Sequence, residues 1–334
     1  MERFLRGFGK LAAGEKKLAG EPHLEKVFAE IIENQIAGSP MLEKVRWTSL
    51  KESQIVRLFG EKGHSISRFM VNQLTALAGL AKRQMKKTKT AKEVAGRDEQ
   101  FQRIADLKEE YRARGLPILS IDTKKKEFIG QFYRAGKSYC EEAIEVCDHD
   151  FPSLAEGRVV PHGIYDATLN KGYLSLGNSK DTSEFLCDNL KYYWEKKIRQ
   201  DYPEAKEMLL LMDGGGSNSC LHYIVKEDLQ NLSNKLKMTI RVAHYPSYSS
   251  KYNPIEHRFF PHLQRSWEGV LFSDYEIIKE RAEQTTTQTG LKVVAWINEK
   301  LYQSGRKYSV DFKETMTIAF DELLPKWNYQ IHPL

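Results

Sequence analysis

The stretch EMLLLMDGGG, residues 207–216, sets the apolar run MLLLM directly before an acid and three glycines. Apolar runs of this kind are typical of strands that are buried on both faces of a sheet. Functional sites of α/β sheets gather at strand ends and in the adjoining loops, so Asp213 is a candidate site residue. The glycines do not form a P-loop, because the G-x-x-x-x-G-K-[ST] pattern is missing here.

Strand and helix patterns alternate on both sides of this run. An antiparallel start that leads into alternating strands and helices predicts a mixed α/β sheet. Several folds share this order, so the function has to be argued from the site. The pattern predicts strands over 117–122, 127–133, 207–212 and 238–244, a hairpin over 162–177, and helices over 181–200 and 220–236.

Two further acids are candidate site residues, one at the end of a predicted strand and one at the start of a predicted helix. Asp122 closes the strand in SIDTKKKE, residues 120–127. Glu256 lies in YPSYSSKYNPIEHR, residues 245–258, where Asn253 is expected to cap a helix and Pro254 to be its first residue. Between Asp213 and Glu256 there is room for one helix, one strand and a loop, so folding could gather all three acids.

Three clustered carboxylates repel one another and resist joint ionisation unless a cation neutralises them. Mg²⁺ prefers oxygen ligands, and two such ions can activate a nucleophilic oxygen and stabilise the leaving oxygen in phosphoryl transfer. The three acids therefore suggest metal-dependent chemistry on a phosphodiester. The pattern leaves alternatives open: a strand-end residue for Asp122, a turn for Asp213 and a capping box for Glu256. A fourth acid, Asp166 in the hairpin, could also approach the site.

The segment 47–80 predicts two short helices around a glycine turn, which is the pattern of a helix-turn-helix. A capping box of Ser49 and Glu52 is expected to start the first helix, and Ser65 or Ser67 to cap the second. An ordinary helical hairpin is the alternative. The second helix would expose side chains suited to base edges and phosphates, namely Arg68, Asn72 and Gln73.

Charge is unevenly distributed along the chain. The net charge is +6, and residues 81–97 alone hold seven Lys/Arg and one Glu. Such a run is either a solvated linker or a phosphate contact. We therefore expect a helical DNA-binding region over 1–80, a basic linker over 81–97 and a catalytic domain over 98–334.

No apolar run approaches the roughly 20 residues that a membrane span needs. The N-terminal sequence also lacks the apolar core of a signal peptide. We expect a cytoplasmic, nucleoid-associated protein that does not contact membranes.

The chain contains four motifs in this order: SIDTKKKEFIG, MDGGGSN, SSKYNPIEHR and TTTQTGLKV. Together they resemble the ISAzo family of bacterial insertion-sequence transposases, distant relatives of the mariner-like group with a ribonuclease H-like DDE domain. The resemblance runs from about residue 20 to the C-terminus. It implies that Asp122, Asp213 and Glu256 are catalytic acids that bind Mg²⁺ or Mn²⁺, as two ions. It also implies nicking at transposon ends and joining of the freed 3′-hydroxyl to target DNA.

The resemblance further implies binding of double-stranded DNA and a homo-oligomer that joins two transposon ends. Expected DNA contacts in the catalytic domain are Lys124, Lys126, His257 and Arg258. Family members usually carry an additional N-terminal helix-turn-helix, which is expected to be absent here, so recognition of the ends stays open. Two other functions fit the sequence: an inactive, transposase-derived DNA-binding protein, and a structure-selective nuclease of the same fold.

Overall fold

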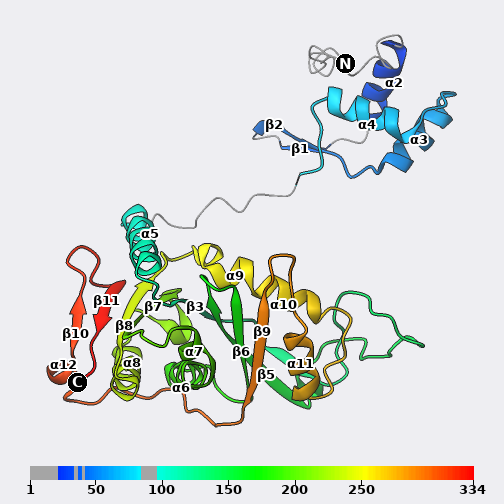
Figure 1. Cartoon of the computed structure of the whole chain (residues 1–334). Helices are drawn as coiled ribbons and strands as arrows, with labels where there is room; N and C mark the ends of the chain where they lie inside the picture. Colours follow the sequence, from blue (N-terminus) through cyan, green and yellow to red (C-terminus); the bar gives the residue numbers. More distant parts are fainter. Residues whose placement is uncertain (1–21, 34–36, 40–41, 84–95) are drawn as a thin grey trace. The chain divides into compact units, whose positions relative to one another are not determined.

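The computed structural model of the chain describes residues 22–33, 37–39, 42–83 and 96–334. The chain divides into two compact units, residues 1–89 and 90–334, which are described separately below (Figure 1). Most of the basic run 81–97 lies outside the described residues, so the linker and the domain boundaries stay predictions. No helix within the described ranges is long and apolar enough to cross a membrane.

The described residues of the first unit form three helices and one antiparallel hairpin. Phe28, Ile32, Phe59 and Leu74 are fully buried and hold the helices together around one small apolar core. The predicted pair of helices around a turn is present. The elements are α2 (Pro22–Glu33), β1 (Ala37–Ser39), β2 (Leu42–Trp47), α3 (Glu52–Glu61) and α4 (Arg68–Leu77).

Two details of this unit differ from the sequence prediction. The expected capping box of Ser49 and Glu52 is wrong, because α3 begins two residues later than that box requires. Lys51 occupies the cap position, and its backbone N–H donates to Oε1 of Gln54 at 2.8 Å. Ser67 does cap α4, accepting from the backbone N–H of Met70 at 3.2 Å. The antiparallel hairpin of β1 and β2 was not predicted.

The second unit contains a nine-stranded mixed sheet with the order β10-β11-β8-β7-β3-β5-β6-β9, and β4 pairs with β5. In its centre β5 runs antiparallel to β3 and β6, whereas β7 and β8 run parallel to β3. This is the ribonuclease H-like arrangement, and it confirms the predicted mixed α/β fold. The strands are β3 (Ile118–Thr123), β4 (Glu127–Ile129), β5 (Gly157–Asp166), β6 (Lys171–Gly177), β7 (Glu207–Met212), β8 (Thr239–His244), β9 (Lys292–Asn298), β10 (Ile318–Phe320) and β11 (Asn328–Ile331).

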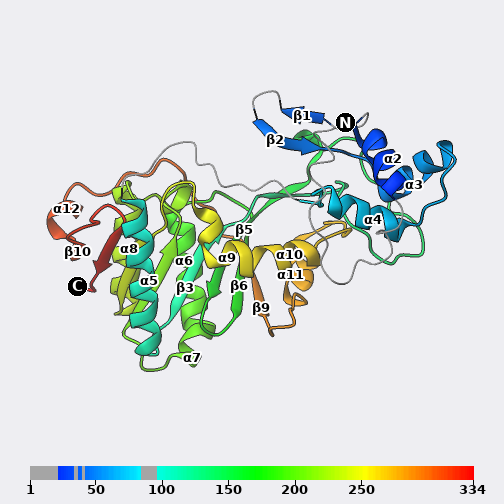
Figure 2. The same ribbon diagram turned by 90° about the horizontal axis from the view of Figure 1, so that it is seen from above.

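Both faces of the sheet are covered, which explains the apolar run in β7. Met208 and Leu210 pack on one face with α6 (Ser183–Tyr193) and α8 (Tyr223–Leu236). Leu209 and Leu211 point to the other face, because side chains alternate along a strand, and there they pack against α5 (Arg97–Ala113). Figure 2 shows this second face, on which α9 (Pro254–Arg258), α10 (Phe260–Ser266) and α11 (Tyr275–Glu283) also lie.

Several predicted boundaries move. The strand expected over 127–133 ends at Ile129, since Gly130 adopts a positive φ of 121°. The helix expected over 181–200 is α6 followed by a π-helical turn, Trp194–Ile198, and the short α7 (Arg199–Asp201). Strand β9, which pairs in parallel with β6, was not predicted.

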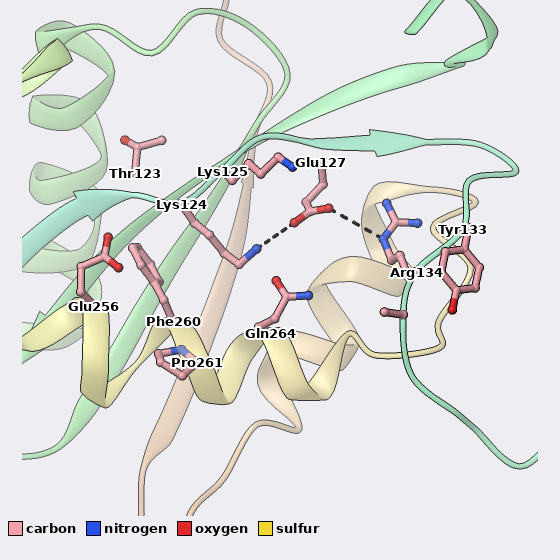
Figure 3. Close-up of a pocket in the computed structure, with 11 residues that line it drawn as sticks. Thr123, Lys124, Lys125, Glu127, Tyr133, Arg134, Glu256, Phe260, Pro261 and Gln264 are labelled. Carbon is pink, nitrogen blue, oxygen red and sulfur yellow. Dashed lines mark hydrogen bonds and ion pairs between the residues drawn. The ribbon is translucent and has the colours of Figure 1, made fainter. Parts of the chain in front are cut away.

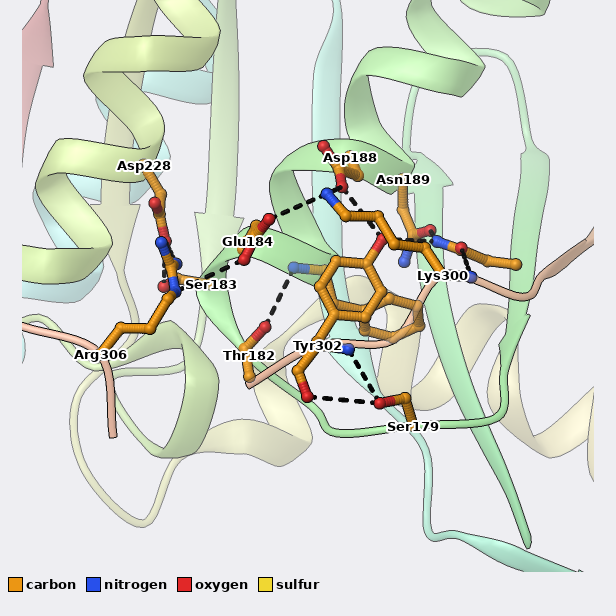
Figure 4. Close-up of polar contacts among 12 residues, drawn as sticks. Ser179, Thr182, Ser183, Glu184, Asp188, Asn189, Asp228, Lys300, Tyr302 and Arg306 are labelled. Carbon is orange, nitrogen blue, oxygen red and sulfur yellow. Dashed lines mark hydrogen bonds and ion pairs between the residues drawn. The ribbon is translucent and has the colours of Figure 1, made fainter. Parts of the chain in front are cut away.

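A polar network fastens the segment after β9 to the helices of the first face (Figure 4). Lys300 Nζ lies 2.8 Å from the Glu184 carboxylate and 2.7 Å from that of Asp188. Arg306 Nη2 contacts Asp228 of α8 at 2.5 Å. These contacts tie the connection toward α12 (Phe312–Thr315) and the last two strands to α6 and α8.

Candidate active site

Two of the three predicted acids lie at the ends of neighbouring parallel strands, Asp122 within the last residues of β3 and Asp213 directly after β7. Ile121 of β3 is in register with Met212 of β7, and each acid comes one residue later. Adjacent strands lie about 4.8 Å apart, so Asp122 and Asp213 stand side by side at one end of the sheet. The structure thus brings these two predicted residues together.

The third acid is brought to the same place by a buried tether between α9 and β3. The Ser120 hydroxyl donates to Oδ1 of Asn253 and accepts from the backbone N–H of Ile255 at 3.0 Å. Nδ2 of Asn253 donates to the carbonyl of Ile121 at 3.4 Å. Ser120 and Asn253 are completely buried. Glu256 therefore follows directly after residues that are fixed to the strand carrying Asp122.

The start of α9 agrees with the predicted position but not with the predicted cap chemistry. Asn253 occupies the cap position before Pro254, yet its side chain makes no capping bond because it is held by β3. The backbone N–H of Asn253 already donates to the carbonyl of Ser250 at 2.8 Å. In a capping box, that same N–H would donate to the Glu256 carboxylate. Because it is already used, the structure does not support a capping box for Glu256.

A glycine lets α9 and α10 approach the sheet closely. Gly163 of β5 is the register partner of Asp122. A Cβ at this position would lie 2.7 Å from the Phe260 ring and 2.8 Å from Cδ1 of Ile255. Any larger residue would push the helix that carries Glu256 away from the strand that carries Asp122.

The three carboxylates are close enough for their charges to shift one another's pKa values. Burial raises the pKa of Asp122 to about 8, and the charge of Asp213 and the nearby Glu256 carboxyl add to the shift. The backbone N–H of Thr123, at 2.7 Å from Oδ1, opposes it. Burial likewise raises the pKa of Asp213, although the backbone of Gly215 and the side chain of Asn218 donate hydrogen bonds to it, and Glu256 raises it further.

This donor set fits a hard divalent cation. All three side chains offer oxygen, and the repulsion that raises their pKa values is what a cation relieves. Among the described residues, no three His, Cys, Asp or Glu side chains already converge on one ion-sized point. Coordination by Asp122, Asp213 and Glu256 therefore requires rotation of their side chains, which lie at a strand end, in a loop and on a short helix.

Sequence reasoning missed one acid near this site and misplaced another. Asp181 accepts a hydrogen bond from the Thr123 hydroxyl at 3.2 Å, and its charge raises the pKa of Asp213. Asp181 lies beside the start of α6, whose cap is Thr182. Asp166 does not approach the site, because it pairs with Leu119 near the start of β3.

The predicted DNA contacts of this unit divide into exposed and covered side chains. Lys126, His257 and Arg258 are exposed. Lys124 is largely covered: its side chain is 10% exposed, and its ammonium group lies 2.8 Å from Glu127. Little of the Lys124 side chain therefore lies at the surface, and its expected DNA contact stays a prediction.

Another basic residue, the half-buried Lys108 of α5, lies close to this group. Burial lowers the pKa of Lys108, and the charges of Arg112 and Arg258 lower it further. Burial followed by the charges of Arg258 and Lys108 lowers the pKa of His257. Positive groups from two separate helices thus crowd together beside Glu256. In the first unit, Arg68 and Asn72 of α4 are exposed and Gln73 is half-buried.

Comparison with known proteins gives one strong match. A family described as the Rhodopirellula transposase DDE domain matches residues 28–333. No curated protein matches the chain.

Solved structures with a similar course of the chain include three of Mos1. The mariner paired end complex with Mn is 14% identical, covers 84% of this chain and 82% of that chain, and has a TM-score of 0.42. The paired end complex with Mg is 14% identical, the match covers 84% of this chain and 77% of that chain, and the TM-score is 0.43. The pre-cleavage transpososome is 15% identical, the match covers 84% of this chain and 75% of that chain, and the TM-score is 0.41. Likenesses of this size carry no argument about activity.

Proposed function

The chain belongs to the Rhodopirellula transposase DDE-domain family, and from this premise we propose that Asp122, Asp213 and Glu256 are its three catalytic acids. A member of this family is a DNA transposase, and therefore a polynucleotidyl transferase. The observation that carries the assignment is the register of Ile121 with Met212, which sets the two aspartates side by side. The tether from Ser120 then brings Glu256 over them.

In this proposal the three carboxylates hold Mg²⁺ or Mn²⁺, as two ions. Such ions polarise the scissile phosphodiester, activate the attacking oxygen and stabilise the leaving oxygen. The protein's own task is to hold its acids in place. The backbone N–H of Thr123 orients Asp122, while Gly215 and Asn218 orient Asp213. Water first cleaves the P–O bond at the transposon end and frees a 3′-hydroxyl. That hydroxyl then attacks a phosphodiester of the target and releases a target 3′-hydroxyl.

We further propose two DNA-binding surfaces, one on each unit. Lys108, Lys126, His257 and Arg258 would bind backbone phosphates beside the acids, because clustered positive charge releases counterions from DNA. On α4, the side chains suited to base edges and phosphates are Arg68, Asn72 and Gln73. Transposition joins two ends, so the active form is proposed to be a homo-oligomer.

Cleavage and strand transfer on a duplex that carries the element's terminal sequence, with Mg²⁺, test this proposal. We expect Asp213→Asn to abolish both reactions while DNA binding is kept. The matched control is Asp311→Asn, which changes an exposed aspartate away from the acids and should keep full activity. Cleavage that survives in Asp213→Asn would refute the assignment. Cleavage of branched DNA without joining would instead identify a structure-selective nuclease, and binding without any cleavage by the unaltered chain would identify an inactive relative.

A further inference from the structure

A cavity of about 570 Å³ adjoins Glu256 (Figure 3). The turn after β3 lines one side of it, the start of α10 lines the other, and residues 133–135 close one end. A space of this size suits a ligand as large as a small organic molecule. A double helix is too wide to enter it, so DNA could occupy it only with a nucleotide that has left the duplex.

Arg134 lines this cavity, and its side chain holds two buried donors that lack acceptors. The side chain of Arg134 is 9% exposed, and its guanidinium group stacks 3.5 Å from the ring centre of Phe272. Nη2 donates to the carbonyl of Phe128 at 2.6 Å. Nε and Nη1 make no hydrogen bond to any described residue, and Nε lies 3.9 Å from the Glu127 carboxylate. Buried donors are destabilising without a partner, and because both atoms are inaccessible, a ligand in the cavity meets them only after the Arg134 side chain turns toward it.

The rest of the wall suits a planar, polar ligand. Tyr133 is 64% exposed despite its large apolar ring, and an exposed aromatic ring is a platform on which any base can stack. Gln264 lines the cavity from α10 and offers both a donor and an acceptor. Aromatic stacking with amide and guanidinium hydrogen bonds is how proteins bind unpaired bases. A small inorganic anion would leave the aromatic surface unused.

The position of the cavity connects it to the reaction. Glu256 lines it together with Thr123, the residue after Asp122. A group that fills it is therefore next to the phosphate on which the acids act. We propose that this cavity takes one unpaired nucleotide adjacent to the reacting phosphate, with its base stacked on Tyr133 and its polar edge on Arg134 and Gln264. The inference rests on the proposed function, since it assumes that the acids act on DNA.

The test uses the full-length chain and a duplex with one unpaired 2-aminopurine nucleotide at its 5′ or 3′ end, against the same duplex with blunt ends. Binding is measured in Ca²⁺. We expect roughly tenfold tighter binding of one of the extended duplexes, which is the size of a stacking contact. Stacking on an aromatic ring should also quench the 2-aminopurine fluorescence in the complex.

Three variants make the test specific. Tyr133→Ala should remove both the quenching and the preference, while Tyr133→Phe, which keeps a ring, should retain both. Tyr139→Ala is the matched control, because Tyr139 is fully exposed in the same loop and does not line the cavity. Thermal melting checks that each variant is folded. We expect all three variants to fold, because both tyrosines are exposed.

Equal affinity for blunt and extended duplexes, or quenching that persists in Tyr133→Ala, would overturn the inference. The outcome is separable from that of the proposed function. If the chain cleaves and joins DNA but shows no preference, only the nucleotide site is refuted. If Asp213→Asn still cleaves, the catalytic assignment fails even where the binding preference is observed.

Discussion

Ser120→Ala should impair both stability and catalysis, because it cuts the tether that positions Glu256. The substitution removes the acceptor of the Ile255 N–H and the partner of Oδ1 in Asn253, and both groups are buried. Leaving a buried polar group without a partner costs about 1–3 kcal/mol. We therefore expect a loss of roughly 2–4 kcal/mol in the free energy of unfolding, measured by urea denaturation.

The same substitution should lower the rate of the chemical step more than a general loss of stability would. Glu256 directly follows the tethered residues, and a displacement of about 1 Å at a catalytic group can reduce the rate roughly 100-fold. Single-turnover cleavage in Mg²⁺, at a temperature where the variant is fully folded, measures this effect. DNA affinity should stay unchanged, since Ser120 is completely buried.

Ser233→Ala provides the matched control for this experiment. Ser233 is also completely buried, and its hydroxyl donates to the carbonyl of Met238 at 2.6 Å, at the end of α8 and away from the acids. It should lose about 1–2 kcal/mol of stability and keep its cleavage rate. If Ser120→Ala also cleaves at the unaltered rate, the tether does not position Glu256, and the reasoning from this contact is refuted.

Four further outcomes follow from the same geometry. Without divalent cations, the free energy of unfolding should fall as the pH rises from about 4 to about 8, by up to about 1.4 kcal/mol per pH unit. The reason is that the folded state binds the Asp122 proton more tightly than the unfolded state does. Asp122→Asn should flatten this slope in urea titrations. Mn²⁺ should raise the melting temperature of the unaltered chain, and Asp213→Asn should lose that increase. Gly163→Ala should cost about 1–3 kcal/mol and slow cleavage, since its Cβ would meet the Phe260 ring at 2.7 Å. Arg258→Ala should weaken binding to all duplexes alike and reduce the slope of log affinity against log salt by about one.

How much of the site could be predicted depended on whether the signal was local. Asp213 follows an apolar run, and Asp122 ends a strand pattern, so both acids could be located from a few neighbouring residues. The tether could not, because Ser120 and Asn253 are 133 residues apart and neither carries a local sign of the other. Asp181 was missed for a similar reason: beside a helix start, an aspartate is explained by capping alone.

The fold shows the same division between local and distant causes. The apolar run of β7 predicted its strand to the residue, whereas β9 was missed because its place beside β6 depends on the whole sheet. Lys124 stands among three consecutive lysines and is expected to contact DNA. Its covered position arises from contacts with Glu127 and with the ring of Trp267, 4.9 Å from its ammonium group, and the Trp267 contact comes from a distant part of the chain.

The short helix α9 explains why the third acid depends on the sheet. It has five residues, and isolated helices shorter than about 12 residues are marginal in water, so its own hydrogen bonds cannot fix Glu256. Its position is set at one end by the tether to Ser120 and at the other by Phe259, which packs so closely on β6 that a Cβ at Gly172 would lie 2.6 Å from its ring. Both anchors are strands of the sheet that carries the aspartates. The three acids are therefore held by one rigid framework, and substitutions in the strands beneath α9 should act on catalysis without touching DNA.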